Sequence, residues 1–140
     1  MDYKKIEQEV QLLYTKKYSE IYRANDIAET EESFHKDITK RLRDITTGFS
    51  YPIDILDIGC GTGRYFYALQ NTQTLTGIDV SGDMLLEAKN PIQKDVITVK
   101  KIQLVCGDIF QHSFPDSSFD FIYSIGVLGE HSPFDSVVCQ

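Results

Sequence analysis

The stretch ILDIGCGTGRYF, residues 55–66, decides the fold because it joins an apolar run to three closely spaced glycines. The apolar residues from 53 onward predict a short buried strand, and the glycines predict a tight turn at its carboxyl end. A Walker phosphate loop would need a lysine directly after its last glycine, and the sequence has Arg64 there. We therefore exclude a Walker loop.

Outward from this stretch, strand-like and helix-like segments alternate. Helices are predicted over 64–70 and over 81–89, the second with Ser81 as its N-cap. Alternation of this kind indicates an α/β fold, with a Rossmann-like, doubly wound and mostly parallel sheet of about four strands. The further strands are predicted over 74–80, 102–108 and 119–127.

The first part of the chain, residues 1–48, predicts two helices that precede the main domain at 49–140. Apolar residues recur at helical spacing over 3–23 and again after Thr30, which can cap the second helix. Gly48 and Pro52 then end that helix. The apolar stripe of the second helix is predicted to consist of Phe34, Ile38, Leu42 and Ile45.

The charge, the cysteines and the apolar runs of the sequence argue against several classes of protein. The net charge of -7 argues against a nucleic-acid or acidic-membrane partner, because both need clustered basic residues. Cys60, Cys106 and Cys139 lack the spacing of a disulfide framework or a zinc site, so no metal is predicted. The amino-terminal residues lack the apolar core of a signal peptide, and no apolar run reaches the ~20 residues of a membrane span. We expect a cytoplasmic protein.

Acidic residues stand at the ends of three predicted strands, where ligands bind in sheets of this kind. Asp57 precedes the glycines and suits an ammonium group, whereas it would repel a pyrophosphate. Asp79 can accept both hydroxyls of a ribose. Asp108 can accept from the exocyclic amine of an adenine, and the Ile109 N–H can donate to a ring nitrogen. The apolar faces of Val80, Met84 and Ile109 would enclose the base.

Other interpretations of these residues stay open. A nicotinamide dinucleotide is disfavoured, because Arg64 replaces the third glycine of the dinucleotide fingerprint and Asp57 opposes a phosphate. Asp79 could instead cap the helix that follows, and Asp108 could be an ordinary turn residue. Arg64, His35 and His112 are predicted to be solvated surface residues.

Four motifs in order, DIGCGTG (57–63), GIDVSGDML (77–85), CGDIF (106–110) and FDFIYSIGVLGEH (119–131), resemble those of class I S-adenosylmethionine-dependent methyltransferases. The resemblance implies S-adenosylmethionine as the cofactor. Asp57 and Gly59 would face its methionine part, and Gly61 and Gly63 would let the backbone approach. It also implies that Asp79 binds the ribose and Asp108 the adenine. The predicted binding set further contains Cys60, whose side chain we expect to pack, and Ser124 at a strand end.

The resemblance implies transfer of a methyl group, and we expect a small-molecule acceptor. Glu130 and His131 are the nearby candidates for acid-base catalysis, although His131 could equally lead into a helix that starts near Pro133. A non-catalytic cofactor-binding module or an inactive fragment is the alternative.

The family's sheet has seven strands, and only four are placed here. We therefore expect the cofactor half to be present and the acceptor half to be largely absent. Strand 119–127 would then be an exposed apolar edge, which predicts self-association.

Overall fold

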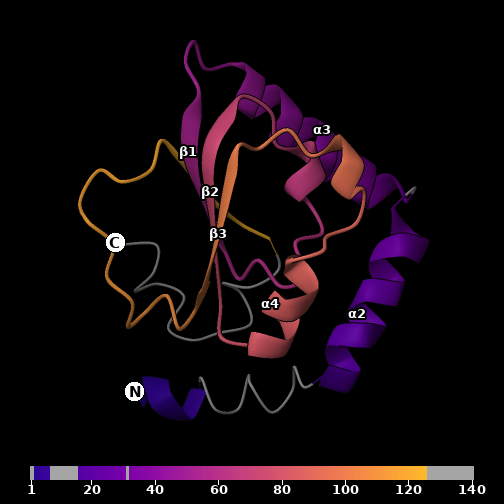
Figure 1. The fold of residues 1–140 in the computed structure, drawn as a ribbon, viewed down its shortest axis with the longest axis vertical. Helices are drawn as coiled ribbons and strands as arrows, with labels where there is room; N and C mark the ends of the chain where they lie inside the picture. The colour runs from indigo at the N-terminus through magenta and orange to yellow at the C-terminus, as the bar shows by residue number, and fades with distance from the viewer. Residues whose placement is uncertain (1, 7–15, 31, 126–140) are drawn as a thin grey trace.

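The chain folds around a four-stranded sheet in which every strand pair is parallel (Figure 1). The structure is a computed structural model and describes residues 2–6, 16–30 and 32–125. The predicted Rossmann-like, doubly wound architecture is confirmed. The strands, in the order β3-β2-β1-β4, are β1 Ile53–Ile58, β2 Thr72–Asp79, β3 Lys101–Cys106 and β4 Phe121–Ser124.

The order of the strands places a switch point beside β1. The chain moves from β1 to β2 and β3, and then returns to pair β4 on the other side of β1. Asp57 near the end of β1 lies opposite Gly77 of β2 and Tyr123 of β4, while Asp79 lies opposite Cys106 of β3. The carboxyl ends of all four strands therefore share one edge, which is where doubly wound sheets bind ligands.

The sheet is buried on both faces around its central strands. Ile55 and Leu75 belong to one apolar cluster, whereas Leu56 and Ile78 belong to a second. Successive side chains of a strand point to opposite faces, so the two clusters cover opposite faces of the sheet. This explains why four of the six residues of β1 are apolar and lie on both faces, rather than on alternate positions only.

The prediction of a helix over 64–70 is wrong. The chain forms turns up to residue 65 and then a single 3-10 turn, η1, at Phe66–Ala68. The length of the connection explains the difference. Returning along the six residues of β1 covers about 20 Å, for which an α-helix needs about 13 residues. After the last glycine, Gly63, only the eight residues 64–71 remain, so the return is more extended than a helix allows. The aromatic residues there are nevertheless buried.

The helix after β2 is confirmed as α4, Gly82–Ala88. Ser81 is its N-cap, because the Met84 N–H donates to the Ser81 hydroxyl oxygen at 3.2 Å. A 3-10 turn, η2 at Lys94–Val96, then leads toward β3.

Two helices precede the sheet, α2 at Lys16–Glu29 and α3 at Ser33–Thr47, and residues 3–6 are also helical. Figure 1 shows α2 lying alongside α4. The predicted cap at Thr30 is wrong: its hydroxyl donates to the Asp26 carbonyl at 2.6 Å, and Glu32 is the N-cap residue of α3. Among the described residues, no helix is long and apolar enough to cross a membrane.

The buried face of α3 is more polar than predicted. Leu42 is buried as expected, but Phe34 is 64% exposed and Ile45 is also exposed. The buried face of α3 is thus turned away from the predicted apolar stripe and includes the fully buried Thr46. Burial of this threonine is possible because its hydroxyl donates to the Leu42 carbonyl at 2.8 Å and accepts the Gln70 N–H at 3.0 Å. The bond with Gln70 joins α3 to the segment before β2. The buried residues of this helix are His35, Thr39, Leu42 and Thr46.

Candidate functional site

The glycine loop after β1 adopts a backbone that only glycine accommodates easily. Gly59, Gly61 and Gly63 have φ values of 70°, 55° and 75°, in the left-handed region. A Cβ atom on Gly63 would lie 2.6 Å from the Phe66 ring, so this position also lacks the space for a side chain. The Gly59 N–H donates to the Ile78 carbonyl at 2.7 Å and thereby fastens the loop to β2.

Asp79 links this loop to the start of α4. One carboxylate oxygen accepts the Gly61 N–H at 2.9 Å, and the other accepts the Ser81 N–H at 2.9 Å. Ser81 is the N-cap of α4, so the alternative interpretation of Asp79 as the cap of this helix is wrong. A carboxylate oxygen can accept more than one hydrogen bond, so these contacts are compatible with the predicted role of Asp79 toward the ribose hydroxyls.

Asp108, after β3, carries an unusual unpaired atom. Its side chain is buried, and Oδ1 accepts the Phe110 N–H at 2.9 Å. Its Oδ2 is also buried, yet it has no hydrogen-bond partner among the described residues. An unpaired buried acceptor costs about 1–3 kcal/mol, so a ligand that donates to Oδ2 would recover this energy. The neighbouring Ile109 packs on the cluster of Leu56 and Ile78.

Apolar side chains adjoin these polar groups. Met84 is buried, and its methyl carbon lies 3.1 Å from where a Gly61 Cβ atom would stand. Val80 is half-buried, and its carbonyl accepts the Cys106 thiol at 3.8 Å. The structure thus brings Met84, the loop and Asp79 together.

Asp57 is buried on the face of the sheet that also carries Tyr123, a residue that the sequence reasoning missed. The Tyr123 hydroxyl donates to Asp57 Oδ2 at 2.8 Å. Burial raises the pKa of Asp57 to about 8, the Tyr123 hydrogen bond opposes this rise, and the charge of Asp79 adds to it. A cation placed beside Asp57 would favour its ionised form. The pairing of β1 with β4 brings Tyr123 to this carboxyl group, and no local pattern could predict the contact.

The prediction that Arg64 is a solvated residue is wrong. Its Nε lies 2.5 Å from Asp26 Oδ1, and its Nη2 lies 3.1 Å from Glu29 Oε2. Burial alone would lower the pKa of Arg64, but the Asp26 carboxylate raises it, so the guanidinium stays charged. An arginine inside a buried loop needs a counter-charge. An arginine directly after three glycines of a buried loop is therefore a sequence signal that could have indicated an acidic partner for Arg64.

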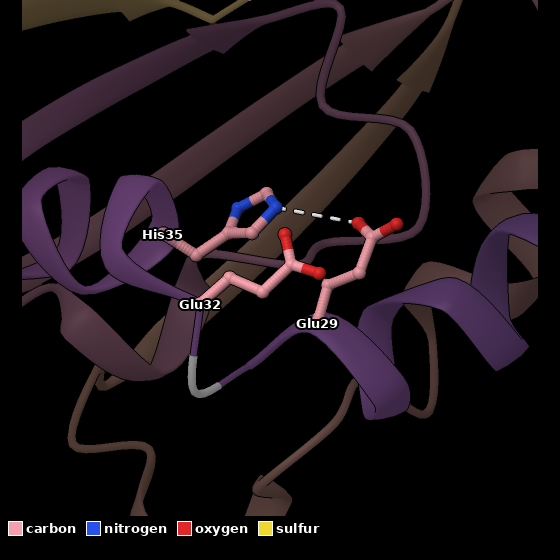
Figure 2. A group of neighbouring side chains, drawn as sticks. All are labelled: Glu29, Glu32 and His35. Atoms are coloured by element: carbon pink, nitrogen blue, oxygen red, sulfur yellow. Dashed lines mark ion pairs between the residues drawn. The ribbon is translucent and has the colours of Figure 1, made fainter.

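The prediction that His35 is a surface residue is also wrong, because its side chain is buried. Its Nδ1 lies 2.6 Å from the Tyr65 hydroxyl oxygen, and its Nε2 lies 3.0 Å from Arg64 Nη1. Figure 2 shows His35 facing Glu29 and Glu32, with 3.3 Å between His35 Nε2 and Glu29 Oε2.

The donor atoms of Glu29, Glu32 and His35 lie within 4.8 Å of one another, a spacing that could suit a metal ion. Arg64, however, contacts both Glu29 and His35, so a positive charge already lies at this cluster. We propose no metal site there.

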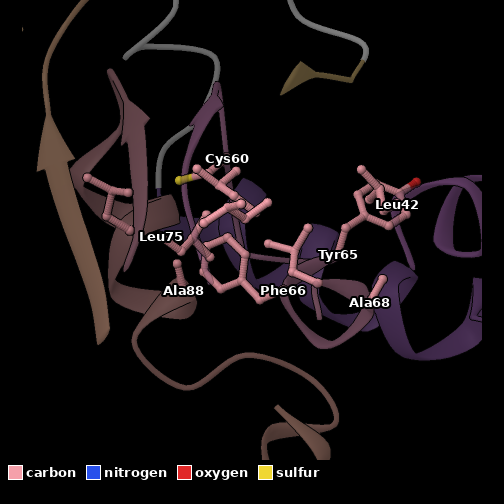
Figure 3. Packing of buried hydrophobic residues seen from close by; sticks show 11 residues of the cluster. Leu42, Cys60, Tyr65, Phe66, Ala68, Leu75 and Ala88 are labelled. Carbon is pink, nitrogen blue, oxygen red and sulfur yellow. The ribbon is translucent and has the colours of Figure 1, made fainter. Parts of the chain in front are cut away.

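Two predicted binding residues direct their side chains into the structure. Cys60 packs in the apolar cluster that includes Phe66 and Leu75 (Figure 3), and burial raises the pKa of its thiol well above the usual value. The Ser124 hydroxyl donates to the Ile58 carbonyl at 3.0 Å. Cofactor contacts by these residues stay predictions. The two catalytic candidates, Glu130 and His131, lie outside the described residues.

A family model described as a methyltransferase domain matches residues 55–139. This range begins within β1 and contains the glycine loop and the strand-end residues Asp79 and Asp108.

Individual proteins agree with this match. The chain is 34% identical over 113 residues to a demethylmenaquinone methyltransferase of Staphylococcus aureus, which covers 77% of this chain and 42% of that protein. Among solved structures, a TehB-like S-adenosylmethionine-dependent methyltransferase from Corynebacterium glutamicum has a TM-score of 0.60 at 26% identity, over 86% of this chain and 61% of that chain.

The [4+2]-cyclase SpnF has a TM-score of 0.70 at 21% identity, over 94% of this chain and 53% of that chain. At this identity the similarity establishes the fold alone. With 42% of the Staphylococcus aureus protein covered, the chain spans about two fifths of the length of the curated relatives it matches.

Proposed function

This chain belongs to the class I S-adenosylmethionine-dependent methyltransferases, and we propose that it transfers a methyl group from S-adenosylmethionine to a small-molecule acceptor. The relative from Staphylococcus aureus is named for a small-molecule acceptor, demethylmenaquinone, which supports an acceptor of that size. The chain matches only 42% of that relative, so methyl transfer and the kind of acceptor are both proposed for this chain and do not follow from the relative's name.

The unpaired Oδ2 atom of Asp108 is the observation that carries the proposal. It is buried after the carboxyl end of β3, and it lacks a donor that an adenine amine would provide. A cationic group beside the buried Asp57 would favour its ionised form, whereas a pyrophosphate there would oppose it. The residues that are present therefore fit S-adenosylmethionine better than a dinucleotide.

The proposed roles of the other residues follow their positions. Asp57 would bind the ammonium group of the methionine part, and Asp79 the ribose hydroxyls. Gly59, Gly61 and Gly63 would let the backbone approach the cofactor, because they lack side chains. The apolar residues proposed to enclose the base are Val80, Met84 and Ile109.

S-adenosylmethionine supplies an activated methyl group on a sulfonium, which leaves readily. The residues of this chain would then act mainly by holding the cofactor in a fixed orientation, since near-attack positioning lowers the barrier of a displacement. We propose that Glu130 or His131 removes a proton where the acceptor must lose one.

We also propose that residues 1–48 form a cover over the domain at 49–140. Tyr3 stacks on Phe110 with 5.2 Å between ring centroids, and Phe110 follows the adenine-side residues Asp108 and Ile109. This contact supports a role for the amino-terminal segment next to the cofactor. Self-association through β4 also stays a proposal, supported by the 53% exposure of Ile122 on that edge strand.

The first test is calorimetric titration of S-adenosylhomocysteine and, separately, of NAD into the purified chain. We expect S-adenosylhomocysteine to bind at a single site and NAD not to bind. A folded chain that does not bind S-adenosylhomocysteine would contradict the proposal.

Methyl transfer needs a separate assay, because a cyclase shares the fold and fold alone does not determine the reaction. Radiolabelled S-adenosylmethionine would be incubated with the chain and a panel of small acceptors that includes demethylated quinones. Transfer of label supports the enzyme, whereas binding without transfer to any acceptor favours the non-catalytic module.

A further inference from the structure

Thr62 lies at the centre of the glycine loop, between two glycines with left-handed φ values, and helix α2 holds it at two points. The Thr62 hydroxyl donates to Asp26 Oδ2. The Thr62 carbonyl accepts from Arg23 Nη2 at 2.9 Å. Both the side chain and the backbone of this loop residue are therefore fixed by the amino-terminal helix.

Asp26 is the centre of this attachment. Its side chain is only 2% exposed, and its two oxygens contact Thr62, Arg64 and Arg23. Arg23 also donates from Nη2 to the Glu87 carbonyl at 2.6 Å and so joins α2 to α4. A buried carboxylate is costly unless it is paired, and here two arginines and a hydroxyl satisfy it.

On its other side the same loop is held by Asp79, which accepts the Gly61 N–H. Thr62 and Gly61 are adjacent, so two aspartates from different parts of the chain restrain neighbouring peptide units. Glycines would otherwise give this segment wide backbone freedom. The shape of the loop thus depends on Asp26 as well as on Asp79.

We propose that Asp26 is a positioning residue for cofactor binding: through Thr62 and Arg64 it holds the glycine loop in the shape that receives the methionine part of S-adenosylmethionine. This inference rests on the proposed function. It makes α2 a part of the cofactor site, although α2 lies outside the range that the family model matches.

The first test compares Asp26→Asn with Asp37→Asn, which makes the same chemical change at an exposed position of α3. Dissociation constants for S-adenosylhomocysteine would be measured by calorimetry, well below the unfolding temperature of each variant. We expect Asp26→Asn to weaken binding at least tenfold and Asp37→Asn to change it less than twofold.

A second pair separates positioning from general stability. Thr62→Ser keeps the hydroxyl that donates to Asp26, whereas Thr62→Val keeps the shape and loses the donor. We expect Thr62→Ser to bind within about threefold of the wild type and Thr62→Val to lose affinity as Asp26→Asn does. The double variant Asp26→Asn/Thr62→Val should bind no more weakly than Asp26→Asn alone, because Asp26→Asn already disturbs the contact that Thr62→Val removes.

The outcomes separate the two proposals. If the wild type binds and both Asp26→Asn and Thr62→Val bind equally well, the role of Asp26 is overturned and the proposed function stands. If the folded wild type does not bind S-adenosylhomocysteine, both are overturned. Should Asp26→Asn fail to fold, the comparison of Thr62→Ser with Thr62→Val still decides.

Discussion

Charged residues at the strand ends and in the amino-terminal helices form two groups, here called flanks, which differ in how their charges are balanced. On the sheet flank, formed by Asp57, Asp79 and Asp108, hydrogen bonds come from backbone N–H groups and one tyrosine. On the helix flank, formed by Arg23, Asp26 and Arg64, a buried carboxylate is matched by two guanidinium groups. The helix flank is an ion-pair network in which both Asp26 oxygens have partners, although the buried Arg23 Nη1 has only the ion pair with Asp26 at 3.5 Å and no hydrogen bond among the described residues.

The difference indicates where a ligand is needed. Burial raises the pKa of Asp57 on the sheet flank, and Asp108 Oδ2 lacks a donor. A ligand with a cationic group and a donating amine would supply what this flank lacks. The helix flank serves instead to fix the backbone on which that ligand rests.

Breaking the loop itself should have the largest effect. Gly63→Ala would force a side chain onto a backbone with φ of 75° and place its Cβ atom 2.6 Å from Phe66. Strain and overpacking together should cost about 2–5 kcal/mol of the free energy of unfolding. Urea unfolding followed by circular dichroism measures this loss.

Gly82→Ala is the matched control for that variant. No atom lies within 4 Å of a Cβ atom at Gly82, and the residue starts α4. We expect its stability to stay equal or to rise by up to about 1 kcal/mol, because alanine favours helices. Equal losses in the two variants would contradict a special role for the loop backbone.

The pH dependence of stability should sharpen the electrostatic difference between the flanks. Asp57 has a pKa of about 8 in the folded chain, against an ordinary value of 3.8. Between these values the unfolded chain loses the proton and the folded chain keeps it. The free energy of unfolding should therefore fall with rising pH, by up to about 1.4 kcal/mol per pH unit from this group.

Asp57→Asn isolates this contribution. Urea unfolding of both chains between pH 5 and pH 8 should show a smaller decline for the variant, because its amide does not titrate. Identical slopes in the two chains would mean that Asp57 is already ionised when folded.

A smaller change should separate affinity from stability at Asp108. In Asp108→Asn the amide oxygen can still accept the Phe110 N–H, so the amide NH2 group would face the position where we place the adenine amine. We expect about a tenfold weaker affinity for S-adenosylhomocysteine, or about 1.4 kcal/mol, with no loss of folding stability. Calorimetry and thermal unfolding measure the two quantities.

Asp116→Asn, at an exposed loop position, is the control and should leave both quantities unchanged. If Asp108→Asn bound as tightly as the wild type, Oδ2 would not contact the cofactor.

The three acids of the sheet flank could be recognised in the sequence because their signals are local, whereas the contact of Tyr123 with Asp57 could not. Apolar runs mark the strands, and Asp79 and Ser81 stand at fixed positions between a strand and a helix. The conformation of 64–70 could not be predicted in this way. Burial of the aromatic residues is evident from their chemistry, but the length of the connection decides between a helix and a 3-10 turn.

The helix flank could not be predicted because its contacts are remote in the sequence. Arg64 reaches Asp26 across 38 positions and His35 across 29. Residues such as these look like ordinary solvated side chains until α2 and α3 pack on the loop. The polar buried face of α3 was missed for the same reason, since Thr46 is satisfied by the distant Gln70.

The short connection between β1 and β2 has a consequence for the order of folding. These strands meet after a small loop closure through residues 59–71, whereas Tyr123 of β4 reaches Asp57 of β1 across 66 positions. Contacts that are distant in sequence form later, because closing a longer loop costs more conformational entropy. We expect the sheet to nucleate at the β1–β2 pair and to grow outward, so that β4 joins last and separates first under denaturing conditions.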